Sequence, residues 1–310
     1  MTQPYRIIIY GAGFEYATVA NTILSFVEKD QIEVLGIMAG SLPQSGTLDG
    51  FRILPKEALC DLEFDYLLLC LKGDPRDAVQ SISQTYGIPR EKIIRSYVLH
   101  QPGFDFERYI HLRESNLTIV ADTCWGGFMY RRLDLRCASS FWNIHIWDAD
   151  YLRLLEDLKG HCSEELGFSH YCPDYRGSHT HPVMKLGDVR IHFIHVDTPD
   201  EACTQWYERV GRINWDNLFI MMCTERRDYE HTFNKLCGNT KGICFVPYET
   251  SEPHSFHLIT SAHADAFHAA VNEPVRVYYG SAGYPFDPVK LLLGEPDFSR
   301  YKPERGELTT

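Results

Sequence analysis

Short apolar runs alternate with amphipathic segments through the first hundred residues of the chain. A continuous apolar run such as residues 66–71 is typical of a strand that is covered on both faces of a sheet. Strands alternating with helices at this spacing predict a parallel, doubly wound α/β sheet, here an N-terminal Rossmann-like domain. The predicted strands are residues 5–10, 32–38, 66–71 and 92–95, and the predicted helices are residues 14–28, 55–62 and 74–86.

The pattern resumes less regularly after a connector at residues 101–109. We therefore expect two domains, residues 1–103 and residues 104–310, the second a less regular α/β domain. Thr198 is the expected N-cap of its clearest helix, because a threonine side chain can accept a hydrogen bond from the first turn. The strands expected in this half are residues 117–121, 189–196, 218–223 and 243–246, and the helices are residues 150–162, 199–213 and 229–236.

Composition narrows the class of protein. The chain has 310 residues, of which 44% are hydrophobic and 23% charged, as in ordinary folded proteins. Its net charge of −12 argues against nucleic acid and anionic membrane surfaces as partners. No apolar run approaches the roughly 20 residues that span a bilayer, so we expect no membrane insertion. The ten cysteines form no Cys-x-x-Cys pair, and no signal peptide is visible, which favours a cytoplasmic protein.

A glycine turn follows the first predicted strand. Gly11 and Gly13 stand where a dinucleotide-binding turn would begin a helix. Tyr16 replaces the third glycine of that fingerprint, and the second strand ends without an acidic residue for a ribose hydroxyl. The turn is therefore either a candidate cofactor-binding site at Gly11 and Gly13 or a tight turn without a ligand, and no cofactor can be named.

The strongest candidate for chemistry is the segment Asp122-Thr-Cys-Trp-Gly-Gly127. It follows a predicted strand, and ligands of open α/β sheets collect at the carboxyl ends of strands. A helix beginning near Phe128 would lower the pKa of the Cys124 thiol and make it a nucleophile. Asp122 and Cys124 are thus catalytic candidates, with Trp125, Gly126 and Gly127 as binding residues. In the alternative interpretation the tryptophan packs, the glycines turn and the cysteine is inert.

Histidines supply a candidate base. On a strand with a two-residue period, His192 and His195 point to opposite faces, so they should not bind one metal ion together. One of them is a general-base candidate and the other a core residue. His179 and His181 share a face, but no familiar ligand spacing accompanies them, so we expect no metal site.

An arginine lies on the apolar face of a predicted helix. Ala202, Trp206, Arg209 and Ile213 recur at helical spacing. A buried guanidinium needs an anionic partner or a ligand. Asp216 or Asp188 is the internal alternative, and an anionic substrate is the functional one. We expect Arg209 and Cys124 to meet in one hollow.

Four sequence blocks resemble the bacterial family of domain of unknown function DUF1919. They are TIVADTCWGGFMYRRLDL, SSFWNIHIWDADYL, HPVMKLGDVRIHFIHV and EACTQWYERVGRINWDNLFI, and the resemblance covers about residues 105–250. Two segments depart from the family pattern, namely Asp122-Thr123 and residues 224–227. The family positions map onto Cys124, Trp125, Gly126, Gly127, Asn143, Asp150, Pro182, His192, His195, Trp206, Arg209, Arg212, Asn214, Trp215 and Asp216.

The resemblance implies a surface-glycan context, because members are often labelled exopolysaccharide biosynthesis proteins and some carry a Rossmann-like N-terminal domain. It adds Asn143, Asn214 and Asp216 as substrate-binding candidates. One hypothesis is a transferase that uses a phosphate-bearing donor, with Arg209 on the phosphate. The alternative is a non-catalytic module that binds a nucleotide-sugar or organises a glycan assembly. The expected partner is a nucleotide-sugar or glycan precursor, and self-association into a homo-oligomer stays open.

Overall fold

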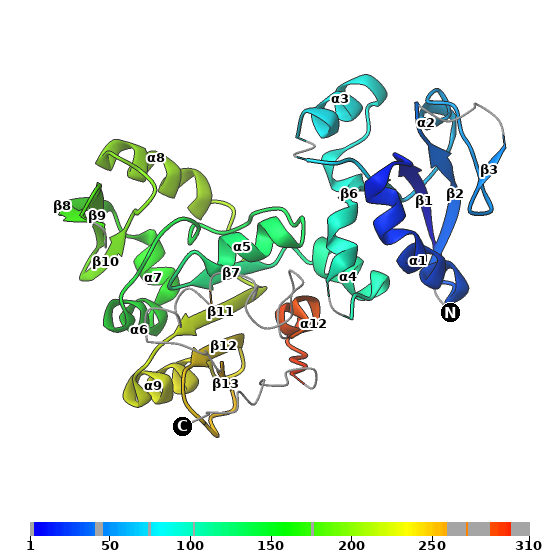
Figure 1. Ribbon diagram of the computed structural model, residues 1–310. Coiled ribbons are helices and arrows are strands. Elements are labelled where there is room, and N and C mark those ends of the chain that lie inside the picture. Colours follow the sequence, from blue (N-terminus) through cyan, green and yellow to red (C-terminus); the bar gives the residue numbers. More distant parts are fainter. Residues whose placement is uncertain are drawn as a thin grey trace, which may run out of the picture. The chain divides into compact units, whose positions relative to one another are not determined.

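The computed structural model of the protein describes residues 3–40, 46–73, 76–101, 103–174, 177–258, 271 and 286–298. The chain divides into two compact units, residues 1–111 and residues 112–310 (Figure 1). The division falls inside helix α4 (Phe106–Glu114), later than the predicted position. The reason is the ring of Phe106, which packs against those of Tyr5 and Phe26 at centroid distances of 5.8 and 5.9 Å.

The first unit holds a four-stranded parallel sheet with the order β2-β1-β5-β6. The predicted N-terminal parallel sheet is therefore confirmed, and the predicted bounds of its first two strands are correct. The elements of this unit are β1 (Tyr5–Tyr10), α1 (Phe14–Glu28), β2 (Ile32–Met38), β3 (Thr47–Leu48), β4 (Phe51–Arg52), α2 (Ala58–Asp61), β5 (Tyr66–Leu69), α3 (Arg76–Tyr86), the 3₁₀ helices η1 (Arg90–Lys92) and η2 (Ser96–His100), and β6 (Ile93–Arg95).

The second unit is built on another four-stranded parallel sheet, ordered β13-β12-β11-β7. Mixed α/β architecture is thus confirmed in both halves of the chain. Its elements are β7 (Thr118–Ala121), α5 (Trp125–Arg132), α6 (Asp148–Glu156), α7 (Leu158–Ser163), β8 (Leu166–Pro173), β9 (Thr180–Leu186), β10 (Val189–His192), α8 (Pro199–Val210), β11 (Leu218–Cys223), α9 (Arg227–Cys237), β12 (Lys241–Val246), β13 (Ser255–His257) and α12 (Pro288–Leu293).

Alternate residues of β11 face two separate parts of the core. Phe219 stacks on Trp125 of α5 at a centroid distance of 6.0 Å, so α5 covers one face of the sheet. Ile220 and Met222 belong to a buried cluster with residues of α6, α8 and α9, which lies on the other face. Because both faces are covered, the strand is apolar along its whole length.

A three-stranded antiparallel sheet, ordered β10-β9-β8, joins this core. Met184 and Ile191 lie opposite each other on its inner face and belong to the buried cluster. Segment 145–146 links the two sheets. The backbone of His145 exchanges hydrogen bonds of 2.9 and 2.8 Å with His192, and the N–H of Ile146 donates to the carbonyl oxygen of Asp122 at 2.8 Å.

Several predicted elements begin or end a few residues away from their predicted bounds, as α8 does by ending at Val210, and two differ in kind. The helix predicted over residues 150–162 is two helices, α6 and α7, because Asp157 has φ −145° and its side chain caps α7 at the N–H of Gly160. The strand predicted over residues 189–196 ends at His192, and the following residues form a turn closed by a hydrogen bond from the N–H of Val196 to the carbonyl of Phe193. Within the described ranges, no helix combines the length and apolar content needed to cross a membrane.

Candidate active site at the carboxyl edge of the second sheet

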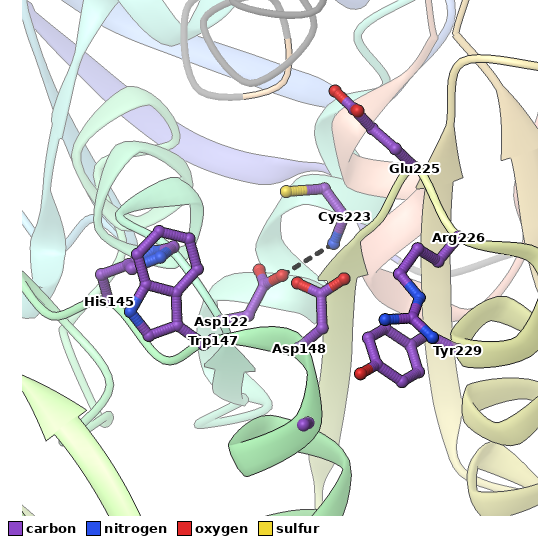
Figure 2. A pocket seen from close by; sticks show the side chains of 9 residues that line it. Asp122, His145, Trp147, Asp148, Cys223, Glu225, Arg226 and Tyr229 are labelled. Atoms are coloured by element: carbon purple, nitrogen blue, oxygen red, sulfur yellow. Dashed lines mark hydrogen bonds between the residues drawn. The ribbon is translucent and has the colours of Figure 1, made fainter. Parts of the chain in front are cut away.

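A pocket of about 370 Å³ opens where β7 and β11 end. Parallel strands bring the residues that follow them to one edge of the sheet, where α/β proteins commonly bind ligands. Figure 2 shows side chains from three chain segments that lie around this pocket. We call it the carboxyl-edge pocket, and it is lined by Asp122, His145, Trp147, Asp148, Ala149, Cys223, Glu225, Arg226 and Tyr229.

Asp122 is the most deeply buried carboxyl group in the pocket, with 2% of the residue exposed. Its Oδ2 accepts a hydrogen bond of 2.9 Å from the backbone N–H of Cys223 (Figure 2). Its Oδ1 is buried and has no hydrogen-bond partner within the described part of the chain. Burial raises the pKa of Asp122 well above its usual value, and the nearby negative charge of Asp148 raises it further.

The hydrogen bond at Oδ2 decides where a proton on Asp122 would sit. Because Oδ2 already accepts an N–H, the neutral acid carries its proton on Oδ1. The raised pKa shifts Asp122 toward this neutral form, in which Oδ1 can donate a hydrogen bond.

Asp148 supplies the second carboxylate of the pocket. It is half-buried, it is the first residue of α6, and it accepts a hydrogen bond from the hydroxyl of Thr224. The pocket therefore joins a buried carboxyl that favours its proton to a more accessible carboxylate that acts as an acceptor.

Aromatic and cationic groups form the rim. The indole of Trp147 is 56% exposed and meets the ring of His145 edge-on at 4.5 Å. Arg226 lies 3.9 Å above the ring of Tyr229 and pairs with Asp228 at 2.6 Å. An exposed aromatic ring beside carboxylates is a common surface for a sugar ring, which offers both apolar and hydroxyl faces.

Cys124 and His195 are the two predicted side chains that the fold brings into contact. The Sγ of Cys124 lies 3.7 Å from the Nε2 of His195, although the residues are far apart in sequence. The expected lowering of the thiol pKa is wrong, because burial raises the pKa of Cys124 to about 11. Helix α5 begins at Trp125, earlier than expected.

His192 and His195 contact different side chains. Strand β10 ends at His192, so His195 lies outside the strand. The two histidines therefore do not occupy opposite faces of one strand, as the two-residue period predicted. The Nδ1 of buried His192 lies 3.1 Å from the Nε2 of His181, and Cys172 completes a group of three. Burial, followed by the charge of His181, lowers the pKa of His192 to about 4. Sequence analysis considered other histidine pairs and missed Cys172.

The Trp-Gly-Gly segment packs against the sheet and a neighbouring loop. Trp125 is fully buried between Phe219 and Phe245. A Cβ on Gly126 would lie 3.1 Å from the side chain of Ile119, and one on Gly127 would lie 2.0 Å from the ring of Trp142. These contacts explain the two glycines by close packing and show that the tryptophan packs in the core.

Arg209 is held by oxygen atoms and an aromatic ring. Its guanidinium donates to the carbonyl of Trp142 at 3.0 Å and to Oε1 of Gln205 at 2.7 Å, and it lies 5.2 Å from the centre of the Trp142 ring. The expected partner Asp188 instead pairs with Arg153 at 3.0 Å. Neither Arg209 nor Cys124 lines the carboxyl-edge pocket, and their expected meeting in one hollow stays a prediction.

The remaining predicted binding residues have local structural roles. Asn143 has a positive φ of 61°, a conformation that asparagine adopts more easily than most residues. Asn214 and Asp216 precede β11, so they lie at the opposite edge of the sheet from Asp122. There, Nδ2 of Asn214 donates to the carbonyl of Asn116 at 3.2 Å, and its Oδ1 accepts from the N–H of Asp216 at 3.3 Å.

The glycine turn of the first unit is explained in part by packing. Gly11 has φ 105°, and a Cβ there would lie 2.4 Å from the carbonyl oxygen of Cys70 in the chain after β5. Gly13 has open space around it and precedes α1 without a capping side chain. Tyr16, in place of the third glycine, is buried and donates to Asp49 at 2.7 Å.

Sequence reasoning missed most of the lining of the pocket. His145, Trp147 and Asp148 belong to a block that was matched to the family, yet no role was assigned to them. Residues 224–227 were noted only as a departure from the family pattern, and two of them, Glu225 and Arg226, line the pocket. The sequence did contain one signal for these residues. Segment 224–227 directly follows a buried strand, as Asp122 does, and ligands of α/β sheets bind at such strand ends.

Comparisons with known proteins agree with the two-part organisation. A family model described as C2185-like, N-terminal, matches residues 3–94. An uncharacterized protein of Haemophilus influenzae (strain ATCC 51907 / DSM 11121 / KW20 / Rd) is 31% identical over 131 residues, which are 42% of this chain. The match spans 61% of the length of that relative. A model described as domain of unknown function (DUF1919) matches residues 96–271, more than half of the chain. The chain therefore belongs to the DUF1919 family.

Proposed function

We propose that the protein is a cytoplasmic transferase of surface-polysaccharide biosynthesis and that the carboxyl-edge pocket is its active site. The observation that carries the proposal is the buried Oδ1 of Asp122, which has no hydrogen-bond partner among the described residues, beside the more accessible carboxylate of Asp148. A buried carboxyl group with a raised pKa beside a more accessible carboxyl group is suited to acid–base chemistry. The exposed ring of Trp147 supports a sugar as the bound group.

The proposed reaction transfers a sugar from a nucleotide-sugar to a glycan hydroxyl. The hydroxyl oxygen forms a bond to the anomeric carbon, and its proton moves to Asp148. The bond between that carbon and the phosphate oxygen breaks, and its electron pair leaves with the nucleoside phosphate. The neutral Asp122 donates a hydrogen bond to this departing oxygen, where a second negative charge would oppose departure.

Release of nucleoside phosphate from a panel of nucleotide-sugars, with and without glycan acceptors, tests the proposal. We expect Asp148→Asn to reduce turnover by about 10²–10⁴-fold, as for loss of a general base. Asp122→Leu, which removes the donor, should cost about 10²–10³-fold, whereas Asp122→Asn keeps an N–H donor and should cost less. Asp216→Asn, at the other edge of the sheet, is the control and should keep full turnover.

Two results would contradict this assignment. Unchanged turnover in Asp148→Asn and Asp122→Leu would move the reaction away from the pocket. Binding of a nucleotide-sugar without turnover, with loss of binding in the same variants, would instead support the non-catalytic binding or scaffold module. In the source organism, deletion of the gene should alter the surface polysaccharide, and the Asp148→Asn gene should fail to restore it.

The first unit is proposed to be Rossmann-like and to hold a nucleotide at Gly11 and Gly13. The open space at Gly13, directly before the fifteen-residue helix α1, supports this role. Gly13→Asp would place a negative charge where a phosphate would bind. It should abolish nucleotide-dependent thermal stabilisation, whereas nucleotide stabilisation equal to that of the unaltered protein would contradict binding at this turn.

A further inference from the structure

Three potential metal ligands lie on one face of the antiparallel sheet. Cys172 on β8 lies directly opposite His181 on β9, and Val183 on β9 lies opposite His192 on β10. His181 and Val183 are two residues apart, so their side chains project from the same face of the sheet. The register of the three strands therefore places Cys172, His181 and His192 side by side, on the face opposite that of Met184 and Ile191.

The distances match the needs of a small metal ion. Each of the three side chains offers one ligand atom, and these atoms all lie within 4.8 Å of one another. The two imidazole nitrogens, Nε2 of His181 and Nδ1 of His192, are 3.1 Å apart. In a tetrahedral zinc site, bonds of about 2.0–2.3 Å hold the ligand atoms roughly 3.3–3.8 Å apart. Small side-chain adjustments would therefore bring all three atoms to coordinating distance.

The surroundings leave these atoms available. His181 is 4% exposed, and its Nδ1 is buried without a hydrogen-bond partner within the described part of the chain. A buried ring nitrogen without a partner costs free energy. The other ring nitrogen, Nε2, contacts Nδ1 of His192 at 3.1 Å, and a metal ion between the two rings would replace this contact. Cys172 is half-buried, and its thiol donates to the carbonyl oxygen of its neighbour Pro173 at 3.5 Å.

We propose that Cys172, His181 and His192 bind a Zn²⁺ ion, with a water molecule in the fourth position. One thiolate and two imidazoles are ligands that zinc prefers, whereas Mg²⁺ and Ca²⁺ prefer oxygen. Binding releases the thiol proton of Cys172 to solvent. This inference does not rest on the proposed transfer reaction.

The site adjoins the carboxyl-edge pocket through a histidine ring. The ring of His192 lies at centroid distances of 6.2 Å from His145 and 6.0 Å from Trp147, both of which line the pocket. A bound ion would hold the ring of His192 in place and so support this wall of the pocket. The proposed role of the metal is to position these side chains.

Two measurements on the full chain, purified without a histidine tag, test the inference. They are the zinc content of the protein and the absorption spectrum of its cobalt-substituted form. After chelation and reloading with Zn²⁺, we expect about one zinc per chain by mass spectrometry of the gel-filtered protein. With Co²⁺ in place of Zn²⁺, a thiolate-to-cobalt charge-transfer band should appear in the near ultraviolet. Cys172→Ser should remove this band, and Cys172→Ser or His181→Asn should weaken zinc binding by about 100-fold or more.

Matched controls separate this cluster from other ligands. Cys203→Ser changes another half-buried cysteine of the same unit, and His179→Asn changes an exposed histidine that pairs with Asp197 at 3.1 Å. Both should keep the zinc content and the cobalt band. Circular dichroism of the metal-free variants checks that each has folded. Failure of the unaltered protein to retain zinc, or an unchanged cobalt band in Cys172→Ser, would overturn the inference.

Discussion

The carboxylate of Asp122 accepts a hydrogen bond of 2.9 Å from the backbone N–H of Cys223, a residue 101 positions later in the chain. This bond ties the end of β7 to the end of its neighbour β11 and fixes one oxygen of the carboxyl group. The other oxygen is buried near Asp148 and has no hydrogen-bond partner in the part of the chain that the structure describes. One backbone contact therefore orients the group on which the proposed chemistry depends.

The raised pKa of Asp122 predicts a specific dependence of stability on pH. The folded protein holds the Asp122 proton to a higher pH than the unfolded chain, whose carboxyl titrates near pH 3.9. Stability relative to Asp122→Asn should therefore fall as pH rises above about 4 and level off beyond the folded pKa. The slope is at most about 1.4 kcal/mol per pH unit.

Urea unfolding of both proteins at a series of pH values measures this difference. The asparagine is a suitable reference because its carbonyl can still accept the N–H of Cys223 while its amide does not titrate. A difference in unfolding free energy that stays constant from pH 4 to pH 9 would contradict the raised pKa.

The pKa of about 11 for Cys124 predicts a poorly reactive thiol at neutral pH. The thiolate is the reactive form, so alkylation of Cys124 should be slow near pH 7 and accelerate steadily toward pH 11. Peptide mapping after a short iodoacetamide pulse measures the rate, with exposed Cys60 as the internal reference. Faster labelling of Cys124 than of Cys60 at pH 7 would instead indicate activation by His195 and restore the cysteine as a nucleophile.

Close packing at Gly127 predicts that a single methyl group is costly. A Cβ there would meet the ring of Trp142, and that ring and its backbone carbonyl hold Arg209. Gly127→Ala should lower the free energy of unfolding by about 1–3 kcal/mol. Gly211→Ala, also in this unit, is the control, because φ is −63° and no atom lies within 4 Å of the added Cβ. Equal stability of the two variants would contradict the packing argument.

The positive φ of Asn143 separates a backbone role from a ligand role. Asn143→Gly should keep the thermal stability, because glycine adopts φ 61° without strain, whereas Asn143→Val should lose about 1–2 kcal/mol. Thermal unfolding measures both variants. If the glycine variant is stable but binds the pocket ligand more weakly, the amide contacts substrate; unchanged binding assigns the residue to the turn alone.

The sequence pattern alone predicted the bounds of elements that bury apolar residues at regular spacing. The predicted bounds of β1, β2 and β11 agree with the structure, because continuous apolar runs can be satisfied in few ways other than a covered strand. Thr198 caps α8 as expected, since capping depends on neighbours within one turn. The position of Asp122 after a strand was also enough to suggest a site.

The tertiary structure was needed to identify which side chains come together at the candidate sites. Strand β8 was not predicted, because it is mostly exposed and lacks a regular apolar alternation, and without it Cys172 could not be placed beside two histidines. The contact of Cys124 with His195, and the meeting of Asp122 with Asp148, join residues that are distant along the chain. A one-dimensional pattern reports which face of a segment is buried, but proximity between segments depends on strand order, register and the path of loops, and these follow from packing of the whole unit.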